Sequence, residues 1–284
     1  MTAFFVTRFA PSPTGYLHRG HAFSALTAFA AARAANGRFL LRVEDIDQTR
    51  CRPDFDAALR EDLAWLGVAW EEPVRRQSEH MDDYRVALDR LRDRGLLYRC
   101  FRTRREIAQA IESAPHGALE AWRGQPLPPE EETRRLARGD AYAWRLSLDA
   151  AARALGGFGG LAFAEEGQGP AGESGVIHAR PALGGDVVLA RKDTGVAYHL
   201  AVVVDDALQG VTHVIRGCDL FEATHVQRLL QALLGLPTPT YRHHRLLTDA
   251  EGRRFAKRDR AETLREIRAR GVSAAALRQE LGFG

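Results

Sequence analysis

Between Arg8 and His21 the chain reads RFAPSPTGYLHRGH, and this stretch decides the fold. Residues 4–9 are mostly apolar and predict a buried strand, whereas proline and glycine make residues 10–15 a loop. Residues 18–35 are rich in alanine and predict a helix that ends at an Asn-Gly pair. Residues 38–44 predict the next strand. This strand–loop–helix–strand order is typical of a parallel sheet in an α/β protein.

The loop ahead of the first helix has the composition of a phosphate-binding site. Backbone N–H groups and the positive end of a helix dipole meet at such a turn. His18 and His21 can donate hydrogen bonds to phosphate oxygens, and Gly20 lets a nucleotide approach the backbone closely. The alternative is that the two histidines only cap the helix. The sequence APSPTG directly before them favours phosphate binding.

Beyond this unit, the alternation of strand and helix predicts one nucleotide-binding sheet whose two halves are separated by an insertion. Helices are predicted from residue 53, around residues 81–94, over residues 103–113 and over residues 130–138. Strands are predicted over residues 97–101, 187–191 and 212–216, and Tyr198, within residues 197–205, reads as a half-buried strand residue. The alternation is lost between residues 100 and 185. We therefore expect residues 1–100 and 186–245 to form two halves of a nucleotide-binding domain, 101–185 an insertion, and 246–284 a basic loop with helices.

The composition excludes several classes of protein. With 284 residues, 45% of them hydrophobic and 27% charged, the chain can form about two domains, or one with an insertion. No apolar run reaches the roughly 18 residues of a membrane span, and the N-terminus has no export signal. The three cysteines lie far apart, which excludes a disulfide scaffold and indicates a reducing cytoplasm. The net charge of +3 does not by itself demand a nucleic-acid partner.

Taken together, the motifs resemble the catalytic domain of class I glutamyl-tRNA synthetases. After RFAPSPTG and HRGH, the matching stretches are VEDIDQTR at residues 43–50, RKDTGVAY at 191–198, VVDD at 203–206 and GVTHVIRG at 210–217. The resemblance covers nearly the whole chain. It implies a Rossmann-like α/β fold split by a mixed insertion, and the use of ATP with Mg²⁺.

The resemblance also implies which residues form the site. Its glutamate-binding positions are Arg8, Ser12, Glu44, Tyr198 and Arg216, its ATP-binding positions are Pro11, His18, Gly20, His21 and Lys257, and its catalytic residues are His18, His21 and Lys257. Glutamate carries two carboxylates and one ammonium, which two arginines and an acid suit. Glu44 would face the ammonium, and which arginine takes which carboxylate stays open. Taken alone, Arg8, Glu44 and Arg216 would each most often form a surface ion pair.

A second signature of the family is degraded. Where the family has a KMSKS-like loop, the chain reads RFAKR from Arg254 to Arg258. Lys257, one of only two lysines in the protein, matches, whereas Arg254 and Ala256 depart from the pattern. We expect Lys257 to contact the ATP phosphates, with a solvated basic loop as the alternative.

The zinc site found in many relatives is degraded as well. Of its Cys-x-Cys pair the chain keeps only Cys100, because Arg102 stands at the second position, and no tyrosine follows before Tyr142. One thiolate does not hold a tetrahedral zinc, and His116 is the only nearby alternative ligand. We expect no zinc and a buried or idle Cys100.

Chain length suggests a branch of the family. Full-length members carry a helical anticodon-binding domain, for which a chain ending at Gly284 leaves no room. The chain therefore resembles the truncated members, which activate glutamate without tRNA and attach it to queuosine in the anticodon of tRNA(Asp). The expected partners are L-glutamate, ATP and that anticodon loop, with no membrane, and a monomer is expected. Its phosphates would contact basic residues near the pocket, namely Arg253, Arg254, Arg258 and Arg260.

Three alternatives stay open. A conventional glutamyl-tRNA synthetase would need another anticodon reader. A cytidylyltransferase-like enzyme also uses an HxGH motif, but it would not need Glu44, Tyr198 and Arg216. A non-catalytic binding module would tolerate the degraded second signature.

Overall fold

The computed structural model describes residues 4–103, 105–108, 122–191, 195–247 and 262–284. Its N-terminal unit consists of β1 (Val6–Phe9), α1 (Arg19–Ala34) and β2 (Arg38–Val43). β1 and β2 are parallel, with Val6 opposite Arg38 and Phe9 opposite Leu41. The strand–helix–strand prediction is therefore confirmed. β3 (Glu71–Arg76) extends this sheet, in the order β1-β2-β3.

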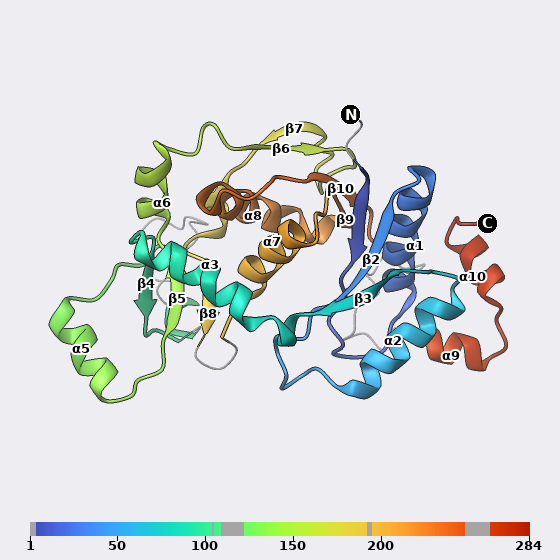
Figure 1. The fold of residues 1–284 in the computed structure, drawn as a ribbon, viewed down its shortest axis with the longest axis horizontal. Coiled ribbons are helices and arrows are strands. Elements are labelled where there is room, and N and C mark those ends of the chain that lie inside the picture. The colour runs from blue at the N-terminus through green and yellow to red at the C-terminus, as the bar shows by residue number, and fades with distance from the viewer. Residues whose placement is uncertain (1–3, 104, 109–121, 192–194, 248–261) are drawn as a thin grey trace.

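The second half of the chain continues the same layer. β9 (His213–Gly217) and β10 (Thr240–His244) are parallel, and β6 (Ala162–Glu165) and β7 (Gly175–His178) complete a sheet in the order β7-β6-β10-β9. β9 lies beside β1, where the Thr212 N–H donates to the Val6 carbonyl. β1 and β9 thus join the two halves at the centre of the molecule (Figure 1).

Helices cover both sides of this layer (Figure 1). On one side lie α1, α2 (Pro53–Trp65), α9 (Leu264–Ala269) and α10 (Ala274–Glu280), and on the other lie α3 (Met81–Asp93), α7 (Tyr198–Leu208) and α8 (Phe221–Leu234). Each side has its own hydrophobic core. The structure is a Rossmann-like α/β fold, as predicted.

Strand alternation sorts residues between the two cores. Val6, Leu40 and Val214 belong to the core beneath α3, α7 and α8. Side chains two positions apart along a strand point to the same face. Arg8, Arg42 and Arg216 therefore lie on that face too, at the carboxyl ends of β1, β2 and β9, and all three are buried.

A smaller antiparallel sheet stands beside this layer, in the order β4 (Leu97–Cys100), β5 (Ala143–Leu146) and β8 (Val188–Arg191). Within residues 101–185 the chain also forms α5 (Pro129–Ala137), α6 (Leu148–Leu155), β6 and β7. Short 3₁₀ helices occur at Gln77–Glu79, Pro181–Gly184 and Cys218–Leu220. Of the helix predicted over residues 103–113, residue 104 and residues 109–113 lie outside the described part. The domain boundaries stay a prediction.

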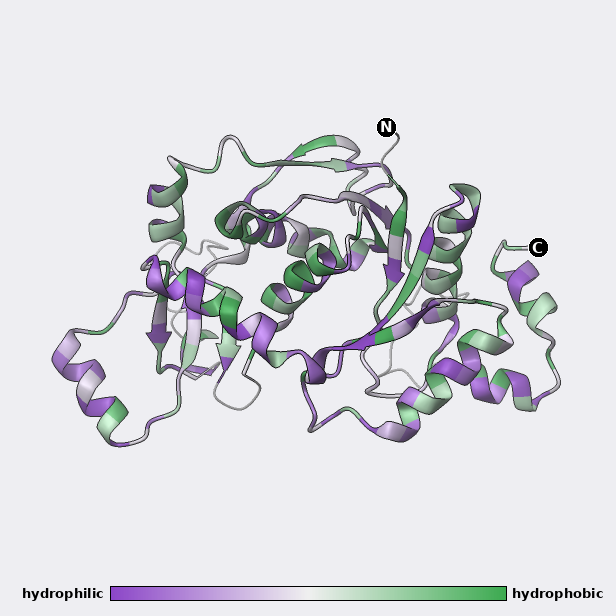
Figure 2. Cartoon of the chain, viewed as in Figure 1, coloured by the Kyte–Doolittle hydropathy of each residue, from purple (hydrophilic) through white to green (hydrophobic). Residues whose placement is uncertain are grey.

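Tyr198 was expected on a strand, and this prediction is wrong, because Tyr198 is the first residue of helix α7. The helical period is hidden because α7 is buried on almost all sides, from Leu200 to Asp206. Figure 2 shows α7 apolar along most of its length, whereas α5 is hydrophilic. A run of valines with no polar face reads equally well as a buried strand.

No helix among the described residues is both long and apolar enough to cross a membrane.

Candidate active site

The predicted site residues that the structure describes come together around one pocket of about 610 Å³. They are Arg8, Pro11, Ser12, His18, Gly20, His21, Glu44, Tyr198 and Arg216. They come from the ends of β1, β2 and β9, the loop before α1 and the first turns of α1 and α7. Lys257, and the neighbouring Arg253, Arg254, Arg258 and Arg260, lie outside the described residues.

His18 and His21 do cap helix α1, and the capping fixes how their rings face the pocket. Nδ1 of His18 accepts from the Gly20 N–H at 3.1 Å, and Nδ1 of His21 accepts from the His18 N–H at 3.2 Å. Since both Nδ1 atoms accept, a neutral ring carries its proton on Nε2, where it is a donor. The centroids of the His18 and His21 rings lie 3.8 Å apart. The capping alternative and the phosphate-binding prediction are therefore compatible.

Gly20 lies in close contact with the His18 ring. A Cβ atom there would lie 3.0 Å from Cε1 of His18. A side chain at this position would require the ring to shift by a few tenths of an ångström.

Arg8 is anchored by a buried carboxylate. Its Nε donates to Oδ1 of Asp206 on α7 at 3.0 Å. The Nη1 group of Arg42, which is fully buried, donates to the same oxygen at 2.8 Å. Burial alone would raise the pKa of Asp206, but Arg8 and Arg42 more than offset it, so this pKa lies below its ordinary value. Asp206 is therefore ionised and holds both guanidinium groups behind the pocket.

Asp205, next to Asp206 on α7, joins a second set of partners. It accepts from Arg75 Nε at 2.7 Å, from Gln77 Nε2 at 2.7 Å and from the Tyr84 hydroxyl at 2.9 Å. Burial and the Asp205 charge raise the pKa of Tyr84, which keeps its hydroxyl a donor. These bonds tie α7 to β3 and α3.

Glu44 faces the pocket from the end of β2. Its carboxylate accepts from Arg42 Nη2 at 3.2 Å. Its pKa is raised, mainly by burial, although Arg42 and Arg8 act in the opposite direction. Its backbone N–H donates to the Pro11 carbonyl, which fixes the strand end against the loop.

Arg216 is held almost entirely by neutral groups. Its Nη2 donates to Oγ1 of Thr224 at 2.7 Å and to Oε1 of Gln227 at 2.9 Å, both on α8. Its Nη1 donates to the Tyr198 hydroxyl, and its Nε to Nε2 of His243, each at 3.2 Å. The charge of Arg8 is thus balanced by the Asp206 carboxylate, which it contacts. The partners of Arg216 named here carry no negative charge, so none of them balances the charge of Arg216.

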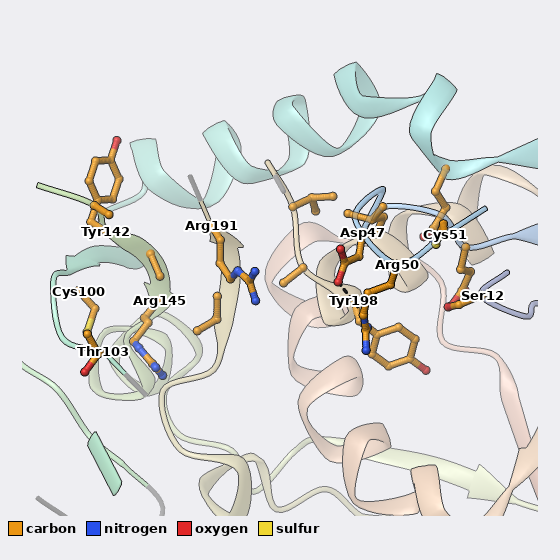
Figure 3. A pocket seen from close by; sticks show the side chains of 18 of the residues that line it. Ser12, Asp47, Arg50, Cys51, Cys100, Thr103, Tyr142, Arg145, Arg191 and Tyr198 are labelled. Carbon is orange, nitrogen blue, oxygen red and sulfur yellow. Dashed lines mark hydrogen bonds and ion pairs between the residues drawn. The ribbon is translucent and has the colours of Figure 1, made fainter. Parts of the chain in front are cut away.

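A second pocket, of about 900 Å³, adjoins the first, because Ser12, Glu44 and Tyr198 line both. Figure 3 shows Tyr198 and Ser12 at one end of it. At the other end lie Arg145 and Cys100 on the smaller sheet and Tyr142 directly before β5.

The described residues on either side of the segment that contains Lys257 lie near the first pocket. Leu247, the last described residue before it, lines the pocket. After it, Thr263 forms a β-bridge with His18, and Glu262 accepts from Arg19 at 2.7 Å. Leu247 and Glu262, the described residues on either side of residues 248–261, therefore lie near the first signature.

The described residues contain no group of three or more His, Cys, Asp or Glu side chains that could hold a metal ion. Cys100 is buried in β4, and the Arg102 guanidinium lies over the Trp122 ring. His116 lies outside the described residues. The absence of zinc stays a prediction.

Sequence reasoning missed the residues that hold the two arginines. Asp206 and Asp205 were noticed only as part of a matching motif, and Arg42, Thr224, Gln227, His243 and Glu165 were not singled out. Adjacent acids at the end of an apolar run of valines were the available signal, because buried acids are rare without partners.

Comparisons with known proteins show the family to which the chain belongs. Residues 5–155 and 172–282 match the family model described as the catalytic domain of class I tRNA synthetases (E and Q). The chain is 50% identical to a glutamyl-Q tRNA(Asp) synthetase from Rhodobacter capsulatus, over 98% of this chain and 100% of that protein. It is 37% identical to a glutamate–tRNA ligase from Prochlorococcus marinus, over 95% of this chain and 56% of that one.

Among solved structures, a glutamate tRNA ligase from Elizabethkingia meningosepticum in complex with its amino acid matches with a TM-score of 0.74 and 28% identity. The match covers 90% of this chain and 52% of the ligase, so the likeness concerns about half of that protein.

Proposed function

We propose a function from one premise, that this chain belongs to the catalytic-domain family of class I tRNA synthetases (E and Q). It is an ATP-dependent ligase that activates L-glutamate and attaches it to queuosine in the anticodon of tRNA(Asp). The observation that carries this proposal is the 50% identity, over that relative's full length, to a protein named glutamyl-Q tRNA(Asp) synthetase. A relative of the same name from Symbiobacterium thermophilum is 43% identical over 82% of its length.

The first pocket suits glutamate and ATP. Glu44 accepts the ammonium group, and Arg8 and Arg216 pair with carboxylates, with Ser12 and Tyr198 beside them. We assign Pro11 and Gly20 to the contact with the adenosine of ATP. We assign the Nε2–H groups of His18 and His21 to hydrogen bonds with the phosphate oxygens. These roles are inferred from the family positions and supported by the shared pocket.

In the first step, an oxygen of the glutamate carboxylate attacks the α-phosphorus of ATP. A bond forms between this oxygen and phosphorus, the bond to the β-phosphate oxygen breaks, and pyrophosphate leaves. A carboxylate is already ionised at pH 7, so no general base is needed. The residues act by holding the reactants in line and by donating to the charge that develops on the leaving phosphates, a role we give to His18, His21 and Lys257.

Magnesium bound to ATP supplies further neutralisation of phosphate charge. Mg²⁺ uses one or two protein carboxylates together with substrate phosphates. Asp219 is the carboxylate in the first pocket that fits this use, because Glu44 is already engaged by Arg42.

In the second step, a hydroxyl of the queuosine ring attacks the glutamyl carbonyl, and AMP leaves. The adjoining pocket supports this step, because it opens beside the glutamate site. Its lining includes Arg50, Arg145 and Arg191, which suit phosphate contacts, and Tyr142, which suits base stacking. An anticodon loop offers unstacked bases that reach such a pocket more easily than a duplex does.

ATP–pyrophosphate exchange tests the activation step. We expect exchange with glutamate in the absence of any tRNA, and none with glutamine or aspartate. Glutamine lacks the second carboxylate that the two arginines recognise. Aspartate has the wrong spacing between its carboxylates and the ammonium group that Glu44 binds. A requirement for tRNA would favour a conventional glutamate–tRNA ligase. Absence of exchange under all conditions would favour a non-catalytic binding module.

A further inference from the structure

Arg216 contacts His243 on β10, which is paired with Glu165 on β6, and no assigned role uses this pair. Both side chains are buried, with 2% of each residue exposed. Nδ1 of His243 and Oε2 of Glu165 are 2.5 Å apart. On the other side of the ring, Nε2 faces Nε of Arg216 at 3.2 Å, and the more distant Oγ1 of Thr224 lies 3.4 Å from the same Nε2. The three residues form one chain of contacts that ends at the pocket.

The chemistry of arginine fixes the protonation of this chain. Arginine carries only donors, so Nε2 of His243 must accept from the Arg216 Nε–H. The ring proton is then on Nδ1, where it donates to Glu165. The Glu165 carboxylate also accepts from the backbone N–H groups of His243 and Gly167, each at 2.8 Å. All of these donors require an ionised Glu165 and a neutral His243.

The surroundings favour the same protonation states. Burial lowers the pKa of His243, and Arg216 and His244 lower it further, against the opposing effect of Glu165. Burial acts to raise the pKa of Glu165, but hydrogen bonds from His243 and Gly167 leave it below its ordinary value. The ring of Tyr241 stacks on His243, and His225 on α8 shares its Phe221 neighbour.

We propose that Glu165 and His243 are positioning residues for the substrate-binding arginine, with Glu165 holding His243 in the tautomer that accepts from Arg216. This proposal rests on the glutamate-binding role of Arg216 in the proposed function. The pair acts through geometry and does not touch substrate. When His243 is protonated, its Nε2–H points at the Arg216 Nε–H, and two donors then face each other. The guanidinium turns away, and the site loses affinity for glutamate.

The sharpest variant is Glu165→Gln, which keeps the shape of the side chain. The glutamine amide nitrogen, which is a donor, faces either the Nδ1–H of His243 or the two backbone N–H groups. In either orientation two donors face each other. We expect the KM for glutamate to rise about tenfold, the scale of one lost hydrogen bond to a charged group, with kcat and the KM for ATP within about threefold of wild type. An unchanged KM for glutamate would overturn the proposal.

His243→Gln and His243→Leu separate positioning from packing. The glutamine amide supplies an acceptor for Arg216 and a donor for Glu165, so we expect the KM for glutamate in His243→Gln to stay within about threefold of wild type. Leucine supplies neither group, so we expect a raised KM for glutamate in His243→Leu. The matched control is His225→Gln, which replaces a buried imidazole beside Phe221 that makes no bond to Arg216. Equal losses in the His225 and His243 variants would indicate packing alone and overturn the proposal.

The pH profile gives a readout that packing does not move. In wild type, the KM for glutamate should rise as the pH falls through the pKa of His243, which lies below 6.5. Glu44, with its raised pKa, titrates in the same direction, whereas His199 has a pKa of about 4 because of burial and the charge of Arg216. The His243→Gln variant keeps Glu44 and His199. The difference between its KM increase at low pH and that of wild type therefore comes from protonation of His243. No difference between the two profiles would contradict the proposal.

Failure of the proposed function is distinguishable from failure of this inference. If wild type shows no exchange with glutamate, the function fails. The ring proton of His243 is observable without any substrate, by ¹⁵N NMR of the free protein. A proton on Nδ1 in wild type supports the pair, and a proton on Nε2 overturns it.

Discussion

Asp206→Asn should lower the free energy of unfolding by about 3–5 kcal/mol, the cost of removing one partner from a buried ion pair. The substitution keeps the volume of the side chain but removes the charge that pairs with Arg8 and with Nη1 of Arg42, which then keeps only its more distant carboxylate neighbours Glu44 and Asp205. The Arg42 side chain is fully buried, so water does not replace the lost carboxylate. Urea denaturation of both proteins at pH 7 measures the difference.

The control for Asp206 is Asp93→Asn, which removes a carboxylate paired with Arg92 on the surface. Exposed pairs contribute about 1 kcal/mol or less. Because the pKa of Asp206 is lowered in the folded protein, its contribution to stability should be fully present above the unfolded pKa near 3.9. It should be lost as the pH falls through the lower folded pKa. A loss below about 1 kcal/mol in Asp206→Asn would show that the pair does not hold the strand ends together.

Lys257→Ala should slow glutamate activation about 30- to 1,000-fold, which corresponds to about 2–4 kcal/mol of barrier. The reason is the loss of one ammonium that stabilises charge on the departing pyrophosphate. The loss should appear in kcat of the exchange reaction more than in the KM for glutamate, since the lysine acts on the phosphates.

The melting temperature of Lys257→Ala, which should equal that of wild type, shows whether the variant is folded. Lys257→Arg should recover part of the rate, because it keeps the charge but not the compact ammonium. Exchange within threefold of wild type in Lys257→Ala would mean that RFAKR is only a solvated basic loop.

Local signals predicted the part of the fold that carries the first signature. β1, α1 and β2 follow directly from an apolar run, a breaker-rich loop and an alanine-rich helix, all of them short-range features. β3 was missed because its sequence, EEPVRR, has no apolar alternation. α7 was misread because burial on all sides removes the helical period.

The site was predictable in its members but not in its support. The resemblance supplied Arg8, Glu44 and Arg216, and the structure brings them to one pocket. What holds Arg8 is Asp206, 198 positions later, and no local pattern pairs residues so far apart. His243 likewise meets Glu165 across 78 positions because β6 and β10 are neighbours in the sheet. Such pairs depend on strand order, which a single sequence does not provide.

The most direct measurement follows the glutamyl group to its acceptor. The protein is incubated with ATP, labelled glutamate and tRNA(Asp) that contains queuosine, and the tRNA is digested to nucleosides. Parallel reactions use tRNA(Asp) without queuosine and tRNA(Glu). We expect label on queuosine in the first reaction and no label in the others. Label on the terminal adenosine of tRNA(Glu) would contradict the proposed function and identify a conventional glutamate–tRNA ligase.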